Sequence, residues 1–551
     1  MRNFTVTVLD TTGIQSYIFG SNRLRENIGA SYLVTQATDD WVRETLTQLK
    51  LSVSQNRQHE PIEESGLAAE IVYAGGGNAM LLFKSNSIAV EFAQKLSRRI
   101  LEKAPGINLV IAHQEFDWDD ASQPLYEVVQ NLIKDDLECK KYERVSSAPL
   151  LGLGVTASCN STQLPAVNTS DEYLDADEQD HYWISREIEE KLRAVKPTDK
   201  TLKSANQALN QKFAGAFNQD AYQFPYRTDY LGRSQDESSY VAVVHADVNG
   251  MGKRFQKHGE GKPNRQYVED MRELSQSVDK AGINALKAIV SVIEDSIKDG
   301  QVIGKLGQFS LKPGDKGKYY LPFRPLVYGG DDVTFVCEAR LGLELAALYL
   351  QELEKQPIAD GESLKACAGI CVVKTHYPFA RAYKISEDLC RQAKNFVKET
   401  EAFEPKGFSA LDWHFAASGL LGTISEIRDR EYRVQVPEYK KPASLAMRPV
   451  RLNENGSDWR TWSGFTQVLK GFSEGNDWKG RKNKVLALRE VLREGIGSTQ
   501  QFIQTYRLKQ LPRFPESSGQ SEQLARDGWL NRFCGYFDAI EAMEFYLSLG
   551  E

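Results

Sequence analysis

The sequence lacks the features that would place the protein in a membrane or in an oxidising compartment. It has no apolar run of about 18 residues, the length that a membrane-spanning helix needs. The opening segment MRNFTVTVLDTTG has neither the basic region nor the cleavage site of a signal peptide, and it predicts a buried strand. The 7 cysteines form no CxxC pair, so a disulfide framework is not expected. We therefore expect a cytoplasmic protein that does not bind a membrane.

The chain also lacks an excess of positive charge. Its net charge is −7 and its isoelectric point is near 5.8, which argues against a protein that coats nucleic acid by charge alone. That balance fits an enzyme that recruits divalent cations to bind nucleoside triphosphates. The 551 residues exceed what one core usually organises, and the length predicts about two to four domains.

Two segments of the chain repeat one order of predicted elements. Residues 3–115 and 239–415 each predict a strand, a helix, two strands joined by a Gly-rich turn, a second helix and a returning strand. This order is the ferredoxin-like pattern of a palm domain. We predict an α+β fold with two palm (nucleotidyl cyclase-like) domains, a mostly helical linking domain and a helical C-terminal domain. The predicted boundaries are 1–120 for the first palm, 121–236 for the linking domain, 237–416 for the second palm and 417–551 for the C-terminal domain.

The segment HADVNGMGKRF, residues 245–255, places an acid at the end of a buried strand. Asp247 is followed by glycines, which let a triphosphate approach the main chain. The carbonyl of Val248 adds a hard oxygen ligand for a cation. We expect Asn249 and Gly250 to contact the nucleotide. Alone this pattern is weak, because Asp-x-x-Gly recurs by chance.

The segment VYGGDDVTFVC, residues 327–337, predicts a tight hairpin with two acids at its tip. Adjacent carboxylates repel each other, and they are tolerated best where a divalent cation lies between them. With Asp247 on the neighbouring strand, Asp331 and Asp332 predict a site for Mg²⁺ or Mn²⁺, and Gly329 and Gly330 let phosphates approach. The alternative is a solvated turn, but the apolar flanks favour a buried hairpin.

These motifs carry a resemblance to a known family. VVHADVNGMGKRF, YGGDDVTFVC, AGICVVKTHYPFARAYKISEDLCRQAK and SALDWHF, in this order, resemble the catalytic palm of the large subunit of type III CRISPR effector complexes, the Cas ten or Cmr two family. LDTTGIQSYIFGSNRLRENIGASYLV and YAGGGNAMLLF resemble that family's first, degenerate palm. The resemblance covers about residues 1–160 and 239–415.

The resemblance implies a function and a set of site residues. Members of the family join ATP into cyclic oligoadenylates that signal viral infection, with nucleotides held between the two palms. By position, Asp247, Asp331 and Asp332 are then the metal ligands. Lys394 matches a lysine that steadies phosphate charge, and its alternative interpretation is a solvated lysine on a helix. Expected partners are nucleoside triphosphates and also RNA or a guide-RNA complex and small helical subunits.

The first palm has no acids at its hairpin. Gly75, Gly76, Gly77 and Asn78 occupy the tip, so this palm is expected to position a nucleotide and not to catalyse. Ser31 and Arg25, near its first long helix, are further candidates for phosphate contacts.

The sequence departs from the family pattern in two places. The palm pattern begins at residue 3, which leaves no room for the HD nuclease domain with which the family often begins, so DNA cleavage is not expected. The family's four-cysteine zinc site has a counterpart only in Cys159, with Cys139 some distance before it, and we predict no structural zinc.

Several alternatives stay open at this stage. His245 is interpreted as a core histidine, with contact to a nucleotide as the alternative. The basic cluster around WKGRKNKVLALR, residues 478–489, is interpreted as a charged helix face, with RNA or partner contact as the alternative. For the whole chain, the rivals to an oligoadenylate synthase are an RNA-binding scaffold with a vestigial palm and a dinucleotide cyclase of the GGDEF type.

Overall fold

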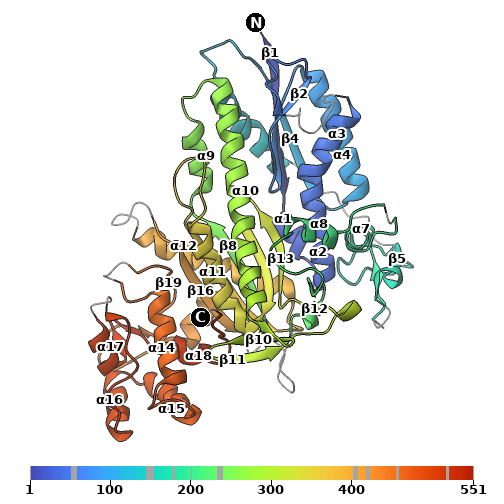
Figure 1. Cartoon of the computed structure of the whole chain (residues 1–551). Coiled ribbons are helices and arrows are strands. Elements are labelled where there is room, and N and C mark those ends of the chain that lie inside the picture. The colour runs from blue at the N-terminus through green and yellow to red at the C-terminus, as the bar shows by residue number, and fades with distance from the viewer. Residues whose placement is uncertain are drawn as a thin grey trace.

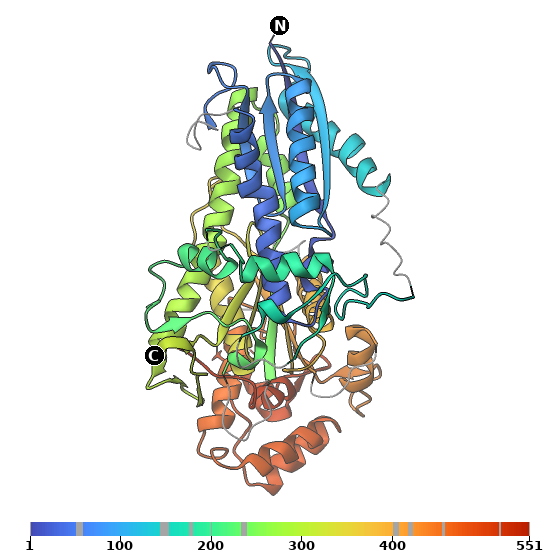
Figure 2. The same ribbon diagram turned by 90° about the vertical axis from the view of Figure 1, so that its right-hand side faces the viewer.

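The structure, a computed structural model, has three parts stacked along one long axis (Figure 1). The first palm lies at one end, the second palm in the middle, and the C-terminal part at the other end (Figure 2). The structure describes residues 2–50, 59–143, 154–175, 180–199, 201–232, 240–400, 407–416, 422–454, 458–516 and 520–549.

The first palm is a four-stranded sheet with the strand order β2-β3-β1-β4. Its central strand β1 is buried on both faces, which explains its nearly continuous apolar and threonine sequence. One face packs against the helices α3 and α4, and the other packs against α5 and the start of α10. The elements of this palm are β1 (Asn3–Thr12), α1 (Ile14–Phe19), α2 (Leu24–Thr35), α3 (Trp41–Gln48), β2 (Ala69–Gly75), β3 (Asn78–Phe83), α4 (Asn86–Lys103) and β4 (Asn108–Asp117).

The second palm is a six-stranded sheet with the order β13-β14-β8-β15-β16-β19. Its first four strands repeat the order of the first palm, so the predicted duplication and the predicted α+β fold are confirmed. The elements are β8 (Tyr240–Val248), α9 (Met251–Gly259), α10 (Asn264–Asp295), β13 (Phe323–Gly329), β14 (Asp332–Glu338), α11 (Gly342–Glu354), β15 (Ala366–Lys374), α12 (Phe379–Glu399), β16 (Ala410–Ala416) and β19 (Val450–Arg451).

The two palms share fine detail as well as strand order. Gly13 and Gly250 each precede the first helix of their palm in the left-handed conformation, with φ/ψ of 68°/24° and 70°/22°. Each hairpin also carries a β-bulge at one place, between Ile71 and Tyr73 in β2 and between Pro325 and Val327 in β13. Glycine is required at positions 13 and 250 because other residues rarely adopt a φ near +70°.

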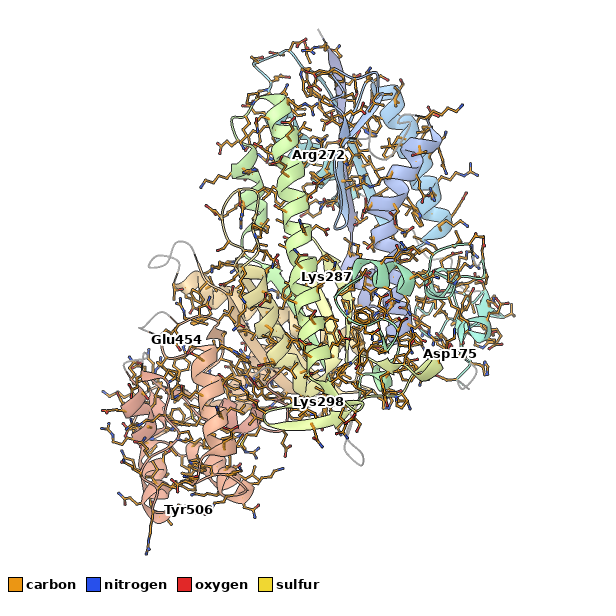
Figure 3. All side chains as sticks on the ribbon, viewed as in Figure 1. Asp175, Arg272, Lys287, Lys298, Glu454 and Tyr506 are labelled. Carbon is orange, nitrogen blue, oxygen red and sulfur yellow. The ribbon has the colours of Figure 1, made fainter. Side chains whose placement is uncertain are left out.

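The palms interlock through one helix from each. The long helix α10 rises out of the second palm and lies against β2 of the first, while α2 of the first palm contacts β13 of the second (Figure 1). Glu70 on β2 is fully buried and pairs with Arg265 and Arg272 of α10, at 2.8 and 2.6 Å. Figure 3 shows Arg272 on the stretch of α10 beside the first sheet.

The remaining helices belong to the linking part and to the C-terminal part. The linking part contains α5 (Leu125–Asn131), a π-helical turn (Leu132–Leu137), α6 (Glu138–Glu143), α7 (Arg186–Val195) and α8 (Ala205–Lys212). The C-terminal part contains α13 (Ile424–Glu431), α14 (Trp462–Glu474), α15 (Lys482–Leu492), α16 (Ile496–Thr505), α17 (Ser521–Asp527) and α18 (Phe537–Ala542).

Sequence patterning did not predict two small sheets. One joins β9 (Ile297–Lys298), β10 (Gln301–Gly304) and β11 (Gly307–Ser310), and the other joins β17 (Arg433–Val434), β18 (Ala443–Ser444), β21 (Phe533–Cys534) and β20 (Trp529–Leu530). None of the helices in the described ranges is both long and apolar enough to span a bilayer.

Candidate active site of the second palm

The acids that the sequence places on two separate segments lie on adjacent antiparallel strands. Asp332, the first residue of β14, is the register partner of Asp247 near the end of β8. The backbone N–H of Val248 donates to the carbonyl of Asp331 at 3.1 Å, which ties the hairpin tip to the end of β8. The turn depends on Gly329 and Gly330, whose φ angles are 141° and 74°.

The electrostatics of the three acids are unfavourable in the protein alone. Burial, together with the charges of Asp247 and Asp331, raises the pKa of Asp332 to about 8. Removal of water and the charge of Asp247 also raise the pKa of Asp331, although this residue is exposed at the hairpin tip. Oδ1 of Asp332 is buried and accepts no hydrogen bond. A cation at this place would satisfy that oxygen and relieve the repulsion.

Lys394 of α12 is the nearest cation to these acids. Its Nζ lies 2.5 Å from Oδ2 of Asp247 and donates more weakly to the carbonyl of Val248, at 3.4 Å. Burial lowers the pKa of Lys394, but the charge of Asp247 more than offsets this, so the net pKa is raised. The interpretation of Lys394 as a solvated surface lysine is therefore wrong.

His245 and Asn249 lie beside the acids and have protein partners. His245 is 4% exposed, and its Nδ1 lies 3.2 Å from Oγ1 of Thr334 and 3.2 Å from Oδ1 of Asp332. Burial lowers the pKa of His245 to about 4, so the imidazole is neutral at neutral pH. This confirms the interpretation as a core histidine. Nδ2 of Asn249 donates to the carbonyl of Phe408 at 3.3 Å, which braces the turn after β8.

One residue of the first palm reaches the acids and was missed from sequence. Nε2 of Gln15, on α1, lies 3.5 Å from Oδ2 of Asp332. Behind it, the ring of Phe19 stacks on Tyr383 of α12 with centroids 3.9 Å apart, which fixes α1 against the second palm. The only sequence signal was position, since Gln15 follows the first-palm turn that matches Gly250.

The first palm repeats this geometry with altered chemistry. Asp10 is the register partner of Asn78, as Asp247 is of Asp332, and the N–H of Thr11 donates to the carbonyl of Gly77 as Val248 does to Asp331. Gly77 and Asn78 thus stand where the second palm has its two adjacent acids. Lys141 pairs with Asp10 at 2.7 Å, just as Lys394 pairs with Asp247. Sequence reasoning missed this retained pair.

The other first-palm candidates have mixed positions. Gly75 and Gly76 lie at the hairpin tip with open space around them, as expected for a nucleotide-facing turn. The hydroxyl of Ser31, by contrast, donates to the carbonyl of Leu326 at the contact between the palms. Arg25 donates to the carbonyl of Tyr173 at 2.7 Å and to Asp175 at 2.6 Å. These partners give Ser31 and Arg25 structural roles, and nucleotide contact by either stays a prediction.

A divalent cation such as Mg²⁺ needs several oxygen ligands close together. Within the described ranges, no three His, Cys, Asp or Glu side chains converge closely enough to form a ready metal site. The pieces at the hairpin still fit a hard cation, because they offer an orphaned buried carboxylate oxygen, two further carboxylates and the Val248 carbonyl. In the protein alone, Lys394 forms an ion pair with one of these carboxylates, that of Asp247.

Together, the fold and the site define a duplicated palm protein with one acid-bearing palm and one acid-poor palm. Residues 240–402 match the family model of the Cas10/Cmr2 second palm domain. The second palm is therefore similar to the second palm domain of Cas10/Cmr2 proteins, in agreement with the resemblance seen in the sequence. No curated protein matches the chain.

Solved structures extend the likeness in fold to the whole chain. A Csm1–Csm4 cassette in complex with cA4 matches with a TM-score of 0.51 and 14% identity, covering 99% of this chain and 70% of that one. Csm1 from T. onnurineus matches with a TM-score of 0.51 and 15% identity, covering 98% of this chain and 69% of that one. A Csm1–Csm4 cassette with AMPPNP matches with a TM-score of 0.50 and 16% identity, covering 98% of this chain and 69% of that one. The chain thus has the fold of Csm1, the large subunit of type III CRISPR complexes.

Proposed function

We propose that this protein is a nucleotidyltransferase that joins ATP into cyclic or linear oligoadenylates. The observation that carries the proposal is the register of Asp247 opposite Asp332, with Asp331 beside them, in a palm similar to the second palm domain of Cas10/Cmr2 proteins. Solved structures with the same fold contain cA4, pppApApA and AMPPNP, which supports adenine nucleotides as substrate and product.

The reaction would be an in-line displacement at phosphorus. The 3′-hydroxyl of one ATP attacks the α-phosphate of a second, forming a new P–O bond while the bond to pyrophosphate breaks and the hydroxyl proton leaves. Lys394 is placed to hold negative charge that develops on the phosphate. Gln15 is placed to hold the first palm, and the nucleotide on it, against the acids.

Asp247, Asp331, Asp332 and the carbonyl of Val248 would hold Mg²⁺ or Mn²⁺. When bound, the cation would neutralise triphosphate charge and lower the pKa of the attacking hydroxyl. The raised pKa values of Asp331 and Asp332 support this assignment, because they show that the protein alone disfavours the ionised carboxylates, which a bound cation would stabilise.

The test is incubation of the purified chain with each of the four nucleoside triphosphates and Mg²⁺, with and without candidate RNA activators, followed by mass spectrometry. Oligoadenylates and released pyrophosphate from ATP are the expected result. A guanine dinucleotide made from GTP alone would favour the GGDEF-type cyclase. No product under any condition would favour the scaffold with a vestigial palm.

We infer as a second function that the chain assembles with a partner subunit on an RNA-guided complex. The solved cassette with the same fold pairs Csm1 with Csm4, which supports a partner of that kind here. Purification of the tagged chain from its native cells, with sequencing of bound RNA and identification of bound proteins, tests this. Recovery of the chain alone, without RNA, would count against it.

A further inference from the structure

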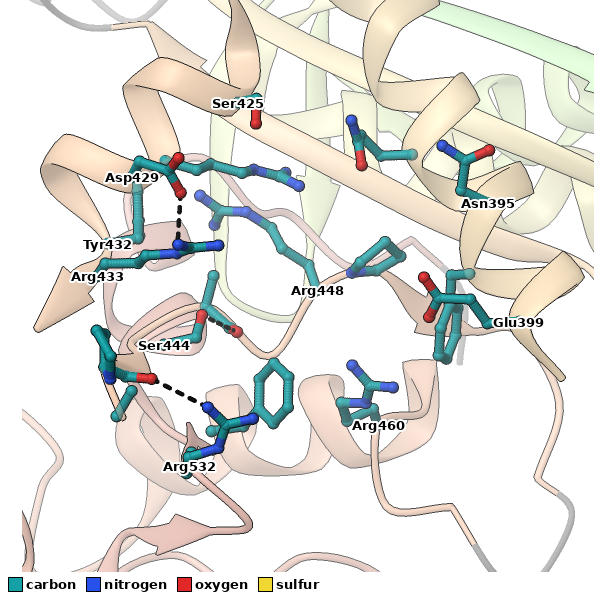
Figure 4. A pocket seen from close by; sticks show the side chains of 18 of the residues that line it. Asn395, Glu399, Ser425, Asp429, Tyr432, Arg433, Ser444, Arg448, Arg460 and Arg532 are labelled. Atoms are coloured by element: carbon teal, nitrogen blue, oxygen red, sulfur yellow. Dashed lines mark hydrogen bonds and ion pairs between the residues drawn. The ribbon is translucent and has the colours of Figure 1, made fainter. Parts of the chain in front are cut away.

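A cavity lies between α12, α13 and later segments of the C-terminal part. Its volume is about 580 Å³, and its lining includes none of the site residues described above. Figure 4 shows that Asn395 and Glu399 of α12, Arg433 after α13, and Arg460 and Arg532 of the C-terminal part surround it. This volume suits a nucleotide-sized ligand and is far more than one phosphate needs.

The lining of this cavity is strongly basic. Only two carboxylates, Glu399 and Asp429, are found on it. Six cationic side chains line it, namely Arg428, Arg433, Lys441, Arg448, Arg460 and Arg532. In a chain with net charge −7, such a local excess is the kind of feature that recruits an anion.

Three of these cations are already paired with acids. Arg428 pairs with the buried Asp412 at 2.5 Å, and Arg433 pairs with Asp429 at 2.8 Å. Arg448 pairs with the buried Asp538 at 2.7 Å through one nitrogen. These pairs hold the guanidinium groups in place, but they do not use every donor. Arg448 is 3% exposed, and its Nε and Nη2 have no hydrogen-bond partner.

Among the described residues, the other three cations have no carboxylate nearer than 4.0 Å. The nearest to Arg460 is Asp458, at 4.0 Å, and the Arg460 guanidinium lies over the rings of Phe396 and Phe533 instead. Arg532 donates to the carbonyl of Pro442 at 3.4 Å. Lys441 is exposed at the rim.

We propose that this cavity is a second nucleotide site, which binds the 5′-phosphate groups of a nucleoside polyphosphate or short oligonucleotide away from the catalytic centre. Arginine forks match phosphate oxygens, and among the described residues no carboxylate lies nearer than 4.0 Å to Arg460, Arg532 or Lys441, so these cations are available to a ligand. Phe533 is half-buried at the wall and offers a ring for a base.

The test uses the full chain carrying Asp331→Asn and Asp332→Asn, in EDTA, so that the catalytic palm cannot hold a phosphate through a cation. The probes are ATP, 5′-triphosphorylated triadenylate, triadenylate with a 5′-hydroxyl, and inorganic tripolyphosphate, each titrated by calorimetry. The cavity variant is Lys441→Gln with Arg532→Gln, both exposed and outside the core. The matched control is Lys479→Gln with Arg481→Gln, an equal loss of charge at two exposed residues just before α15.

We expect the triphosphorylated probes to bind and the cavity variant to weaken them at least tenfold, with less than a twofold change in the control. Stronger binding of triadenylate triphosphate than of ATP would identify an oligonucleotide as the ligand, and equal binding would identify a mononucleotide. If inorganic tripolyphosphate binds as tightly as ATP and as triphosphorylated triadenylate, the assignment of a nucleotide ligand is overturned. Absence of binding, or equal weakening in cavity and control variants, would overturn the site. The synthase proposal stands or falls separately, because its acids are neutralised in this experiment.

Discussion

Gln15 and Asp332 belong to different palms, yet their side chains meet, with Nε2 of Gln15 3.5 Å from Oδ2 of Asp332. The carboxylate also belongs to the hairpin that carries the proposed chemistry. The candidate site is therefore not confined to the second palm. It also includes Gln15 of α1, the helix that follows the first strand of the first palm.

Gln15→Ala is expected to lower oligoadenylate synthesis about tenfold, since one hydrogen bond that aligns the palms is lost. Folding stability should change by less than about 0.5 kcal/mol because Gln15 is half-buried at the palm interface. Pyrophosphate release and thermal unfolding measure the two effects. The control is Ser16→Ala, an exposed neighbour on α1. Equal activity of the two variants would show that Gln15 has no part in the reaction.

Lys394→Met is expected to lower the rate about 100-fold, because it removes the cation that faces the acids and the transferred phosphate. Lys384→Met, on the same helix but exposed and paired with Glu387 at 2.7 Å, is the matched control and should leave the rate unchanged. Initial rates at saturating ATP measure this. A Lys394→Met protein as active as the control would rule out a role for this lysine in the reaction.

Much of this site could be predicted from sequence, and the reason is local. The acids of DV and GGDD stand at strand ends that pair directly, so the motifs alone place Asp247, Asp331 and Asp332 together. Lys394 came only from the family resemblance, since α12 is distant in sequence. Gln15 and the Asp10–Lys141 pair were missed because they depend on how the palms face each other and on the fold of the linking helices, which periodicity does not encode.

The protein partners of Ser31 and Arg25 could not be predicted from the sequence. Both are polar residues on or near a predicted helix, and nothing in the sequence indicates that α2 packs against β13 and the linking part. The fold class was predictable because strand order repeats in the sequence. The small sheets formed by two- to four-residue strands were not, because such short segments carry no periodicity.

Glu70→Ala is expected to destabilise the contact between the palms by about 3 kcal/mol, since it leaves Arg272 without its buried carboxylate and Arg265 with Glu63 alone. Chemical unfolding measures the loss. The control is Glu102→Ala, an exposed acid of α4 paired with Arg98, which should cost less than about 1 kcal/mol. Equal stability of the two variants would show that this network does not hold α10 on the first sheet.

His414 on β16 makes the stability depend on pH. It is 1% exposed, neither ring nitrogen has a hydrogen-bond partner, and burial, with the charges of Arg448 and Arg428, lowers its pKa to about 3. The folded imidazole stays neutral while the unfolded one takes a proton below its ordinary pKa of about 6.5. Stability is therefore complete above that pH and falls by about 1.4 kcal/mol per unit below it, down to about pH 3.

The measurement is urea unfolding followed by tryptophan fluorescence at pH 7 and pH 5, with His414→Phe as the comparison. The wild type should lose about 2 kcal/mol more than His414→Phe between these two values, because the variant lacks the titrating ring. An identical loss in both proteins would show that His414 does not contribute to acid sensitivity.

The central claim is that one acid-bearing hairpin performs the chemistry, and the most direct measurement is product formation by the Asp331→Asn/Asp332→Asn protein. Wild type, this variant and Asp388→Asn, a partly buried acid of α12 that pairs with Arg391, are incubated with ATP, Mg²⁺ and the candidate RNA activators, and oligoadenylates are quantified by mass spectrometry. We predict product from wild type and Asp388→Asn and a loss of about 100-fold or more in the double variant. Oligoadenylates at the wild-type level from the double variant would contradict the account.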